Sequence, residues 1–153
     1  MIDPVTLRTV VGDPEVFAAS VESSTDPADT VLESLMAGRL DEALRRADRL
    51  GGSSADSPFR LRALAADVRS ARGDHDAAIG AYRDLLAGTT GGPREAVVRQ
   101  HLGKALFAAG QLTAAAEQFE LALRRRTAAG ASAELVASSR LALDRVRELL
   151  AGS

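Results

Sequence analysis

Apolar residues recur along most of the chain at intervals of three and four residues, the spacing of one face of an α-helix. Around Gly110 the series comprises Val98, Leu102, Ala105 and Ala109 before the glycine, and Leu112, Ala115, Ala116, Phe119, Ala122 and Leu123 after it. Runs rich in β-branched and aromatic residues, which favour strands, are nearly absent. The pattern therefore predicts an all-α protein built from amphipathic helices.

The pattern around Gly110 recurs at two earlier glycines, Gly38 and Gly73. Gly73 follows Gly38 by 35 residues, and Gly110 follows Gly73 by 37. An alanine follows each glycine by five residues, an alanine or a ring by nine, and an apolar residue by twelve: Ala43, Ala78 and Ala115; Ala47, Tyr82 and Phe119; Leu50, Leu85 and Ala122. Glycine ends a helix at little cost because it readily adopts a left-handed backbone conformation. Each unit is therefore predicted to be an antiparallel helix hairpin.

Residues suited to a helix start follow each of these glycines, namely Asp41 and Glu42, Asp76, and Thr113. Loops rich in Gly, Ser and Pro are expected at 23–26, 51–58, 89–93 and 127–132. The resulting division is an N-terminal cap of short helices (1–25), three hairpins within 26–127 (26–50, 58–88 and 93–127) and a C-terminal capping helix (128–153). Two Asp-Pro pairs, which suit helix starts, predict the short N-terminal helices at about 4–11 and 14–22.

The fixed spacing of small and large residues has a packing interpretation. Two helices that cross closely need small residues on both sides, a role predicted for Gly103 with Ala115 and for Ala66 with Ala78. Phe119 or Tyr82 would then fill the space towards the neighbouring hairpin. The alternative is that both rings are ordinary core residues of a helical bundle.

The series Leu102-Gly103, Leu106, Gly110, Ala115, Phe119 and Ala122 resembles the tetratricopeptide repeat, a helix–turn–helix unit of about 34 residues. The resemblance covers about two-thirds of the chain, is closest in 96–127 and is weakest in 27–50. The chain departs from the family in lacking its Trp and its closing Pro, and in placing Arg69 where a large apolar residue is usual. The resemblance implies a right-handed helical-hairpin solenoid of about three repeats with capping helices at both ends.

The resemblance also implies a concave groove lined by the first helix of each hairpin. The matching positions, our candidate partner-binding residues, are Arg60, Ala63, Asp67, Ser70 and Ala71 in the second repeat, and Val97, Gln100, Lys104, Phe107 and Ala108 in the third. Phe107 is either an apolar anchor for the partner or a residue packed under the C-terminal helix. The chain contains no Asn, so we expect that it is not a receptor of the family's type that binds chaperone C-termini.

Charge and composition narrow the choice of partner. The formal net charge is −2, which argues against nucleic acid, and residues 1–38 carry seven acids and only Arg8, a net of −6. The densest basic run, Arg124 to Arg126, suits a solvated helix end, or else a contact with a phosphate or an acidic partner. We expect a cytoplasmic protein without a disulfide, because the chain has no cysteine, no apparent signal peptide and no apolar run long enough to span a membrane.

No catalytic, metal-binding or nucleotide-binding pattern stands out. The only two histidines, His75 and His101, lack a second histidine at helical spacing, and Thr89-Thr90-Gly91-Gly92 lacks the lysine of a phosphate loop. We therefore predict no enzyme activity and no cofactor or metal. The predicted function is a non-enzymatic module that binds a peptide or helix of a partner protein. The alternative is a structural protein that self-associates into a homo-oligomer, and the third hypothesis is a small-molecule sensor.

Overall fold

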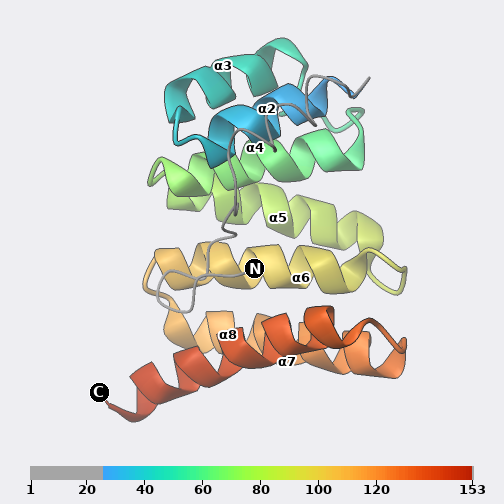
Figure 1. Ribbon diagram of the computed structural model, residues 1–153, viewed down its shortest axis with the longest axis vertical. Helices are drawn as coiled ribbons and strands as arrows, with labels where there is room; N and C mark the ends of the chain where they lie inside the picture. The colour runs from blue at the N-terminus through green and yellow to red at the C-terminus, as the bar shows by residue number, and fades with distance from the viewer. Residues whose placement is uncertain (1–25, 153) are drawn as a thin grey trace.

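The computed structural model describes residues 26–152, and every regular element in this part of the chain is an α-helix (Figure 1). The seven described helices are α2 (Ala28–Met36), α3 (Leu40–Arg49), α4 (Phe59–Ala71), α5 (His75–Thr89), α6 (Glu95–Ala108), α7 (Leu112–Ala128) and α8 (Ala133–Ala151). The predicted all-α class is confirmed. The N-terminal cap and its two short helices were predicted for residues that lie outside the described part.

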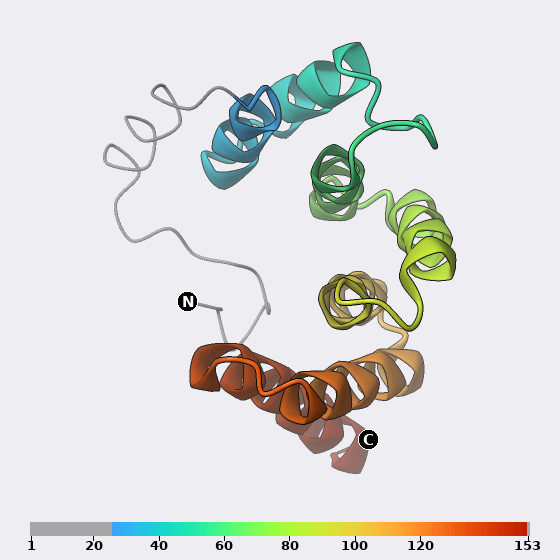
Figure 2. The same ribbon diagram turned by 90° about the vertical axis from the view of Figure 1, so that its right-hand side faces the viewer.

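The seven helices pack sequentially in antiparallel pairs: α2 with α3, α4 with α5, and α6 with α7, followed by α8 on α7. The first helices of successive pairs also touch, α2 with α4 and α4 with α6. In Figure 2, α4 and α6 lie on one side of the molecule and α5 lies on the other. The side formed by α4 and α6 is called the inner face below, and the side formed by α5 the outer face.

The same glycine turn joins the two helices of each pair. Gly38, Gly73 and Gly110 have φ angles of 77°, 88° and 78°, so the predicted left-handed conformation is confirmed at all three. In each turn the glycine N–H donates to the carbonyl three residues back, and the next N–H donates to the carbonyl five residues before it. This pair of hydrogen bonds satisfies carbonyls that the helix end would leave unpaired.

The acidic residues that follow these turns do not act as helix caps. Asp41, Glu42 and Asp76 lie in the first turns of α3 and α5, where no side chain accepts a cap hydrogen bond, and α7 also begins without one. Their carboxylates instead place negative charge near the positive end of the helix dipole.

The buried residues form two clusters. The larger one extends from α4 to α8 and contains Tyr82, Phe119, Leu102 and Leu106 among its largest side chains. The smaller one joins α2 and α3 to α4, and α2 and α3 contribute only alanine and valine to its buried residues. The three repeated alanines, Ala43, Ala78 and Ala115, are fully buried, whereas Leu50 at the last repeated position is 39% exposed.

Phe119 packs inside its own pair of helices. A Cβ atom added to Gly103 of α6 would lie 2.6 Å from Cε1 of the Phe119 ring on α7. We predicted that this ring fills the space towards the neighbouring hairpin, but the edge of the ring occupies the space that the missing side chain of Gly103 leaves. The absence of a side chain at Gly103 therefore leaves space for the Phe119 ring.

Candidate functional site

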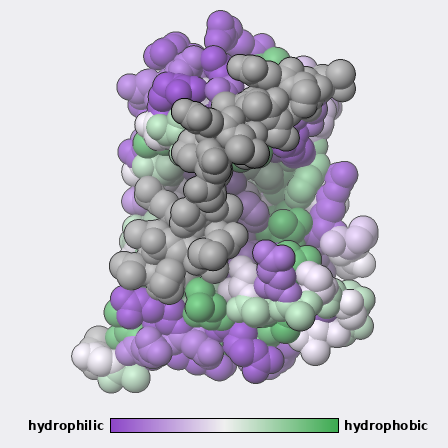
Figure 3. All heavy atoms as spheres, viewed as in Figure 1, coloured by the Kyte–Doolittle hydropathy of each residue, from purple (hydrophilic) through white to green (hydrophobic). Residues whose placement is uncertain are grey.

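A cavity of about 180 Å³ opens between α4 and α6 on the inner face. Apolar side chains form most of its wall, and a few polar side chains lie among them. The lining residues are Phe59, Arg60, Ala63, Leu64, Asp67, Tyr82, Val97, Val98 and His101. Figure 3 shows hydrophilic surfaces at the two ends of this face and several hydrophobic residues between them.

Two arginines border the apolar part of the cavity. The guanidinium of Arg94 lies 4.5 Å from the centroid of the Phe59 ring, a distance at which a cation is attracted to the face of the ring. Arg60 forms ion pairs with Asp26 and Asp29, at the start of the described chain. These contacts tie the beginning of α4 to the segment that leads into α2.

A hydrogen-bonded cluster of Asp67, Tyr82 and His101 forms the polar part of the cavity wall. The Tyr82 hydroxyl donates to the carboxylate of Asp67 and lies 3.1 Å from the carbonyl oxygen of Ala63. Nδ1 of His101 lies 3.0 Å from Oδ1 of Asp67. The three side chains come from α4, α5 and α6, so the cluster links two successive helix pairs.

The contacts within the cluster shift the pKa values of two of its members, Asp67 and Tyr82. Burial by itself would raise the pKa of Asp67, but the charge and hydrogen bond of His101, the charge of Lys104 and the hydrogen bond of Tyr82 together lower it. The pKa of Tyr82 is raised well above its usual value, first by burial and then by the negative charge of Asp67. The stable arrangement at neutral pH is therefore an ionised carboxylate that accepts a hydrogen bond from a protonated phenol.

Two poorly hydrated cations lie further along α6 and under α8. Burial lowers the pKa of Lys104; the charge of Asp67 opposes this effect and the charge of Arg126 adds to it. Arg126 of α7 is 7% exposed, and burial lowers its pKa as well. Arg126 donates to the carbonyl of Leu135 and to the hydroxyl of Ser139. Neither cation forms an ion pair with a carboxylate of the described residues.

The structure brings four of the predicted groove residues together at the cavity, namely Arg60, Ala63, Asp67 and Val97. Ser70, Ala71 and Lys104 are half-buried and Ala108 is exposed. Gln100 is only 3% exposed, because its Oε1 accepts a hydrogen bond from Ser139 of α8. Phe107 is half-buried and packs against the larger core cluster.

Phe59 and Tyr82 are not among the groove residues predicted from the sequence, and His101 is predicted there only as a surface or groove-lining histidine. One signal for His101 was present, because it stands four residues after Val97 and so shares its helix face. The spacing of Tyr82 predicts only a packing ring and does not assign a partner to its hydroxyl. A buried tyrosine needs a partner for its O–H, and this need points to a polar residue on a neighbouring helix.

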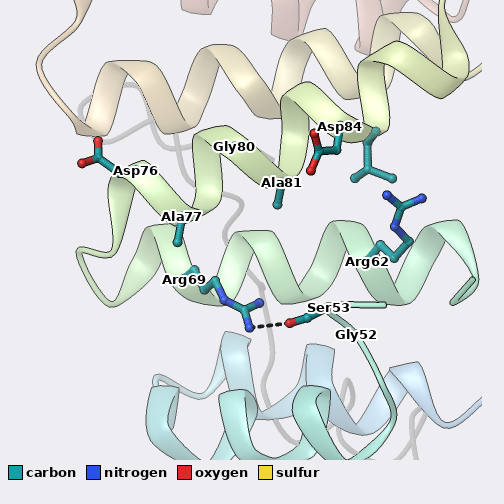
Figure 4. Close-up of a pocket in the computed structure, with 10 residues that line it drawn as sticks. Gly52, Ser53, Arg62, Arg69, Asp76, Ala77, Gly80, Ala81 and Asp84 are labelled. Atoms are coloured by element: carbon teal, nitrogen blue, oxygen red, sulfur yellow. Dashed lines mark hydrogen bonds between the residues drawn. The ribbon is translucent and has the colours of Figure 1, made fainter. Parts of the chain in front are cut away.

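A second cavity, of about 330 Å³, lies beside α5 on the outer side of α4 (Figure 4). The small residues Ala77, Gly80 and Ala81 leave it open along α5, and Arg69 crosses its lower edge. Arg69 donates to the hydroxyl of Ser53 at 2.8 Å and pairs with Asp48 at 3.1 Å. Arg69 thus makes polar contacts with the end of α3 and with the loop that follows it.

Comparison of the chain with protein-family models, with curated proteins and with solved structures found no match in any of the three. Among the described helices, none has both the length and the apolar character needed to cross a membrane. A search of residues 26–152 for three or more grouped His, Cys, Asp or Glu side chains that could hold a metal ion also found none.

Proposed function

We propose that the chain is a right-handed helical-hairpin solenoid of the tetratricopeptide type, with three repeats and α8 as its C-terminal cap. The identical hydrogen bonds of the three glycine turns support a common repeat. Two further repeated positions lie seven residues before and nine residues after each glycine. Where the first position holds a valine, the second holds an alanine, and where the first holds an alanine or a glycine, the second holds an aromatic ring. The pairs are Val31 with Ala47, Ala66 with Tyr82, and Gly103 with Phe119, and all their buried side chains belong to the core.

On this basis, the inner face is the part of the protein that binds a peptide or a helix of a partner protein. The observation that carries the proposal is the cavity between α4 and α6, where apolar side chains surround a fixed polar cluster. A partner could bury an apolar side chain in such a cavity while the polar cluster orients it. The raised pKa of Tyr82 argues against a catalytic role for the cluster, because a phenol that stays protonated is a poor base or nucleophile.

Selection of random peptides displayed on phage against the full chain tests this proposal. Enriched peptides should bind the unmodified chain and lose binding to Ala63→Glu and Val97→Glu, two variants that place a charge at the cavity. Ala77→Glu adds the same charge on the outer face and should retain binding. Circular dichroism verifies that all three variants keep their helices. Peptides that bind the folded Val97→Glu and Ala63→Glu variants unchanged would remove the inner face as the binding surface.

One specific observation favours the alternative, self-association. Three of the exposed large hydrophobic side chains in the described part of the chain lie on α8, namely Leu135, Leu141 and Leu150. Such side chains on a terminal helix can pair two copies of a chain. Sedimentation velocity over a range of concentrations decides between the two proposals. A dimer that dissociates in a Leu135→Glu, Leu141→Glu double variant supports self-association, and a monomer at every concentration excludes it.

A further inference from the structure

We propose that residues 1–25 of this chain bind the inner face of the same molecule, beside the cavity, so that a partner must displace them. This inference rests on the proposed function, because it concerns the regulation of the same site. It follows from three features: cations on or near the inner face that lack a carboxylate, the composition of residues 1–25, and the point at which the chain reaches the cavity.

The cations are Arg94, Lys104 and Arg126. Arg94 lies over Phe59 at the cavity, and Lys104 is close enough to Asp67 for their charges to interact. None of the three forms an ion pair with a carboxylate within residues 26–152, whereas Arg60, Arg69 and Arg72 each pair with an acid from an earlier segment of the chain. Arg94 is exposed and Lys104 is half-buried, and Lys104 and Arg126 lie close enough for their like charges to interact. An added carboxylate would be attracted to this group of positive charges.

Residues 1–25 carry the complementary charge. They contain Asp3, Asp13, Glu15 and Glu22 against the single base Arg8, four acids and one base, for a net of −3. Apolar side chains stand among these acids, including Val10, Val11, Val16 and Phe17. The mixture matches a surface on which an apolar cavity is bordered by unpaired cations.

The chain reaches the described part of the molecule at the cavity itself. Asp26, the first described residue, pairs with Arg60, which lines the cavity. Asp67 lies two helical turns from Arg60 on α4, or about 10 Å. Glu22 precedes Asp26 by only four residues, a span of at most about 14 Å. The preceding residues can therefore reach the cavity and Lys104 without a long linker, and the attachment gives them a high effective concentration there.

Paramagnetic relaxation enhancement in the full chain tests the proposal directly. The chain has no cysteine, so Ser20→Cys provides a single attachment point for a nitroxide label. The amide signals of Ala63, Val97 and His101 should be broadened by the label and recover when it is reduced. The amide signals of Ala77 and Asp84 on α5 should be unaffected. Equal broadening of both sets, or broadening of neither, overturns the proposal.

Charge reversal supplies the matched controls. Lys104→Glu should abolish the broadening on the inner face, and so should Asp13→Lys combined with Glu15→Lys. Arg83→Glu changes the net charge as Lys104→Glu does, but on an exposed position of α5, and should leave the broadening intact. If Lys104→Glu disturbs the fold, Lys104→Met, which keeps the length of the side chain, replaces it. Broadening that persists in a folded Lys104 variant contradicts the charge argument.

Two further measurements separate this inference from its alternatives. To detect binding between copies, nitroxide-labelled protein without ¹⁵N is mixed with ¹⁵N-labelled protein that carries no nitroxide. Broadening of the ¹⁵N-labelled copy in that mixture would overturn an intramolecular contact. The selected phage peptides should restore the inner-face signals in the labelled chain by displacing residues 1–25. If those peptides bind the inner face but the label never broadens it, this inference fails and the proposed function stands. If the label broadens the inner face but no peptide binds even the Asp13→Lys, Glu15→Lys variant, in which the broadening is lost, the proposed function fails.

Discussion

A single methyl group added at Gly103 tests how closely α6 and α7 pack. The new Cβ would lie 2.6 Å from a fully buried ring that cannot move away cheaply. Overpacking of this kind costs about 1–3 kcal/mol, whereas alanine gains up to about 1 kcal/mol over glycine inside a helix. We therefore expect Gly103→Ala to lower the free energy of unfolding by about 1 kcal/mol net, measured by urea denaturation.

Gly80 provides the control for this substitution. It lies inside α5, is exposed, and has no atom within 4 Å of the position that a Cβ would take. Gly80→Ala should therefore stabilise the protein by up to about 1 kcal/mol. Two glycine-to-alanine changes in helix interiors are thus expected to have opposite signs. A stabilised Gly103→Ala variant would show that Phe119 does not depend on the missing side chain.

Asp67 should make part of the stability depend on acidic pH. Its pKa is lower in the folded state than in the unfolded chain, so its contribution is present above the unfolded value and is lost as pH falls below about 4. Asp67→Asn should lower the free energy of unfolding by about 1–3 kcal/mol at pH 7, because it removes a charged acceptor from two hydrogen bonds. The difference from the unmodified protein should shrink at pH 3, measured by urea denaturation at both pH values.

The exposed Asp56, which lies in the loop before α4, is the matched control for this pH effect. Asp56→Asn should change the free energy of unfolding by no more than about 0.5 kcal/mol at either pH. An Asp67→Asn variant whose deficit is the same at pH 3 and pH 7 would contradict the role of the ionised carboxylate in the cluster.

At the scale of the element, the turn between α6 and α7 depends on one backbone conformation. Gly110 has a φ of 78°, where an L-residue costs about 1–2 kcal/mol. No atom lies within 4 Å of the position of a Cβ, so backbone strain alone should set the effect. Gly110→Ala should lower the free energy of unfolding by about 1 kcal/mol, and so should Gly73→Ala at the equivalent turn. Thermal unfolding with matched denaturant curves measures both; a neutral result at either turn would contradict the common repeat.

The helices and their glycine turns could be predicted because both depend on local signals. The spacing of Ala43, Ala78 and Ala115 marks the buried face of three helices, and the glycines mark where the preceding helices end. The polar cluster could not be predicted in this way. Its members, Asp67, Tyr82 and His101, come from three helices, and their contact depends on how successive pairs stack. The burial of Gln100 likewise depends on where α8 crosses α6, which no local pattern specifies.

At the scale of the whole molecule, the division of the core predicts uneven stability. The larger cluster holds the buried rings Tyr82 and Phe119 and takes residues from α4 to α8. Among its buried residues, the smaller cluster receives only Ala28, Val31, Ala43 and Ala47 from α2 and α3; the leucines of these two helices, Leu32, Leu35 and Leu44, are only partly buried against it. Because free energy from burial grows with apolar area, α2 and α3 gain less from packing than any later pair. Their ion pairs, such as Arg46 with Glu42, are partly exposed and add little.

We therefore expect α2 and α3 to open before the rest of the molecule. In native-state hydrogen exchange followed by mass spectrometry, their amides should exchange at a lower free energy of opening than those of α5 to α7, because local opening exposes little apolar surface there. Gly103→Ala should then reduce the protection of α6 and α7 and leave that of α2 and α3 nearly unchanged, since the latter already open independently. Equal protection in all pairs would mean that the two clusters unfold as one unit, and that contacts of α2 with α4 couple them more strongly than their small buried side chains indicate.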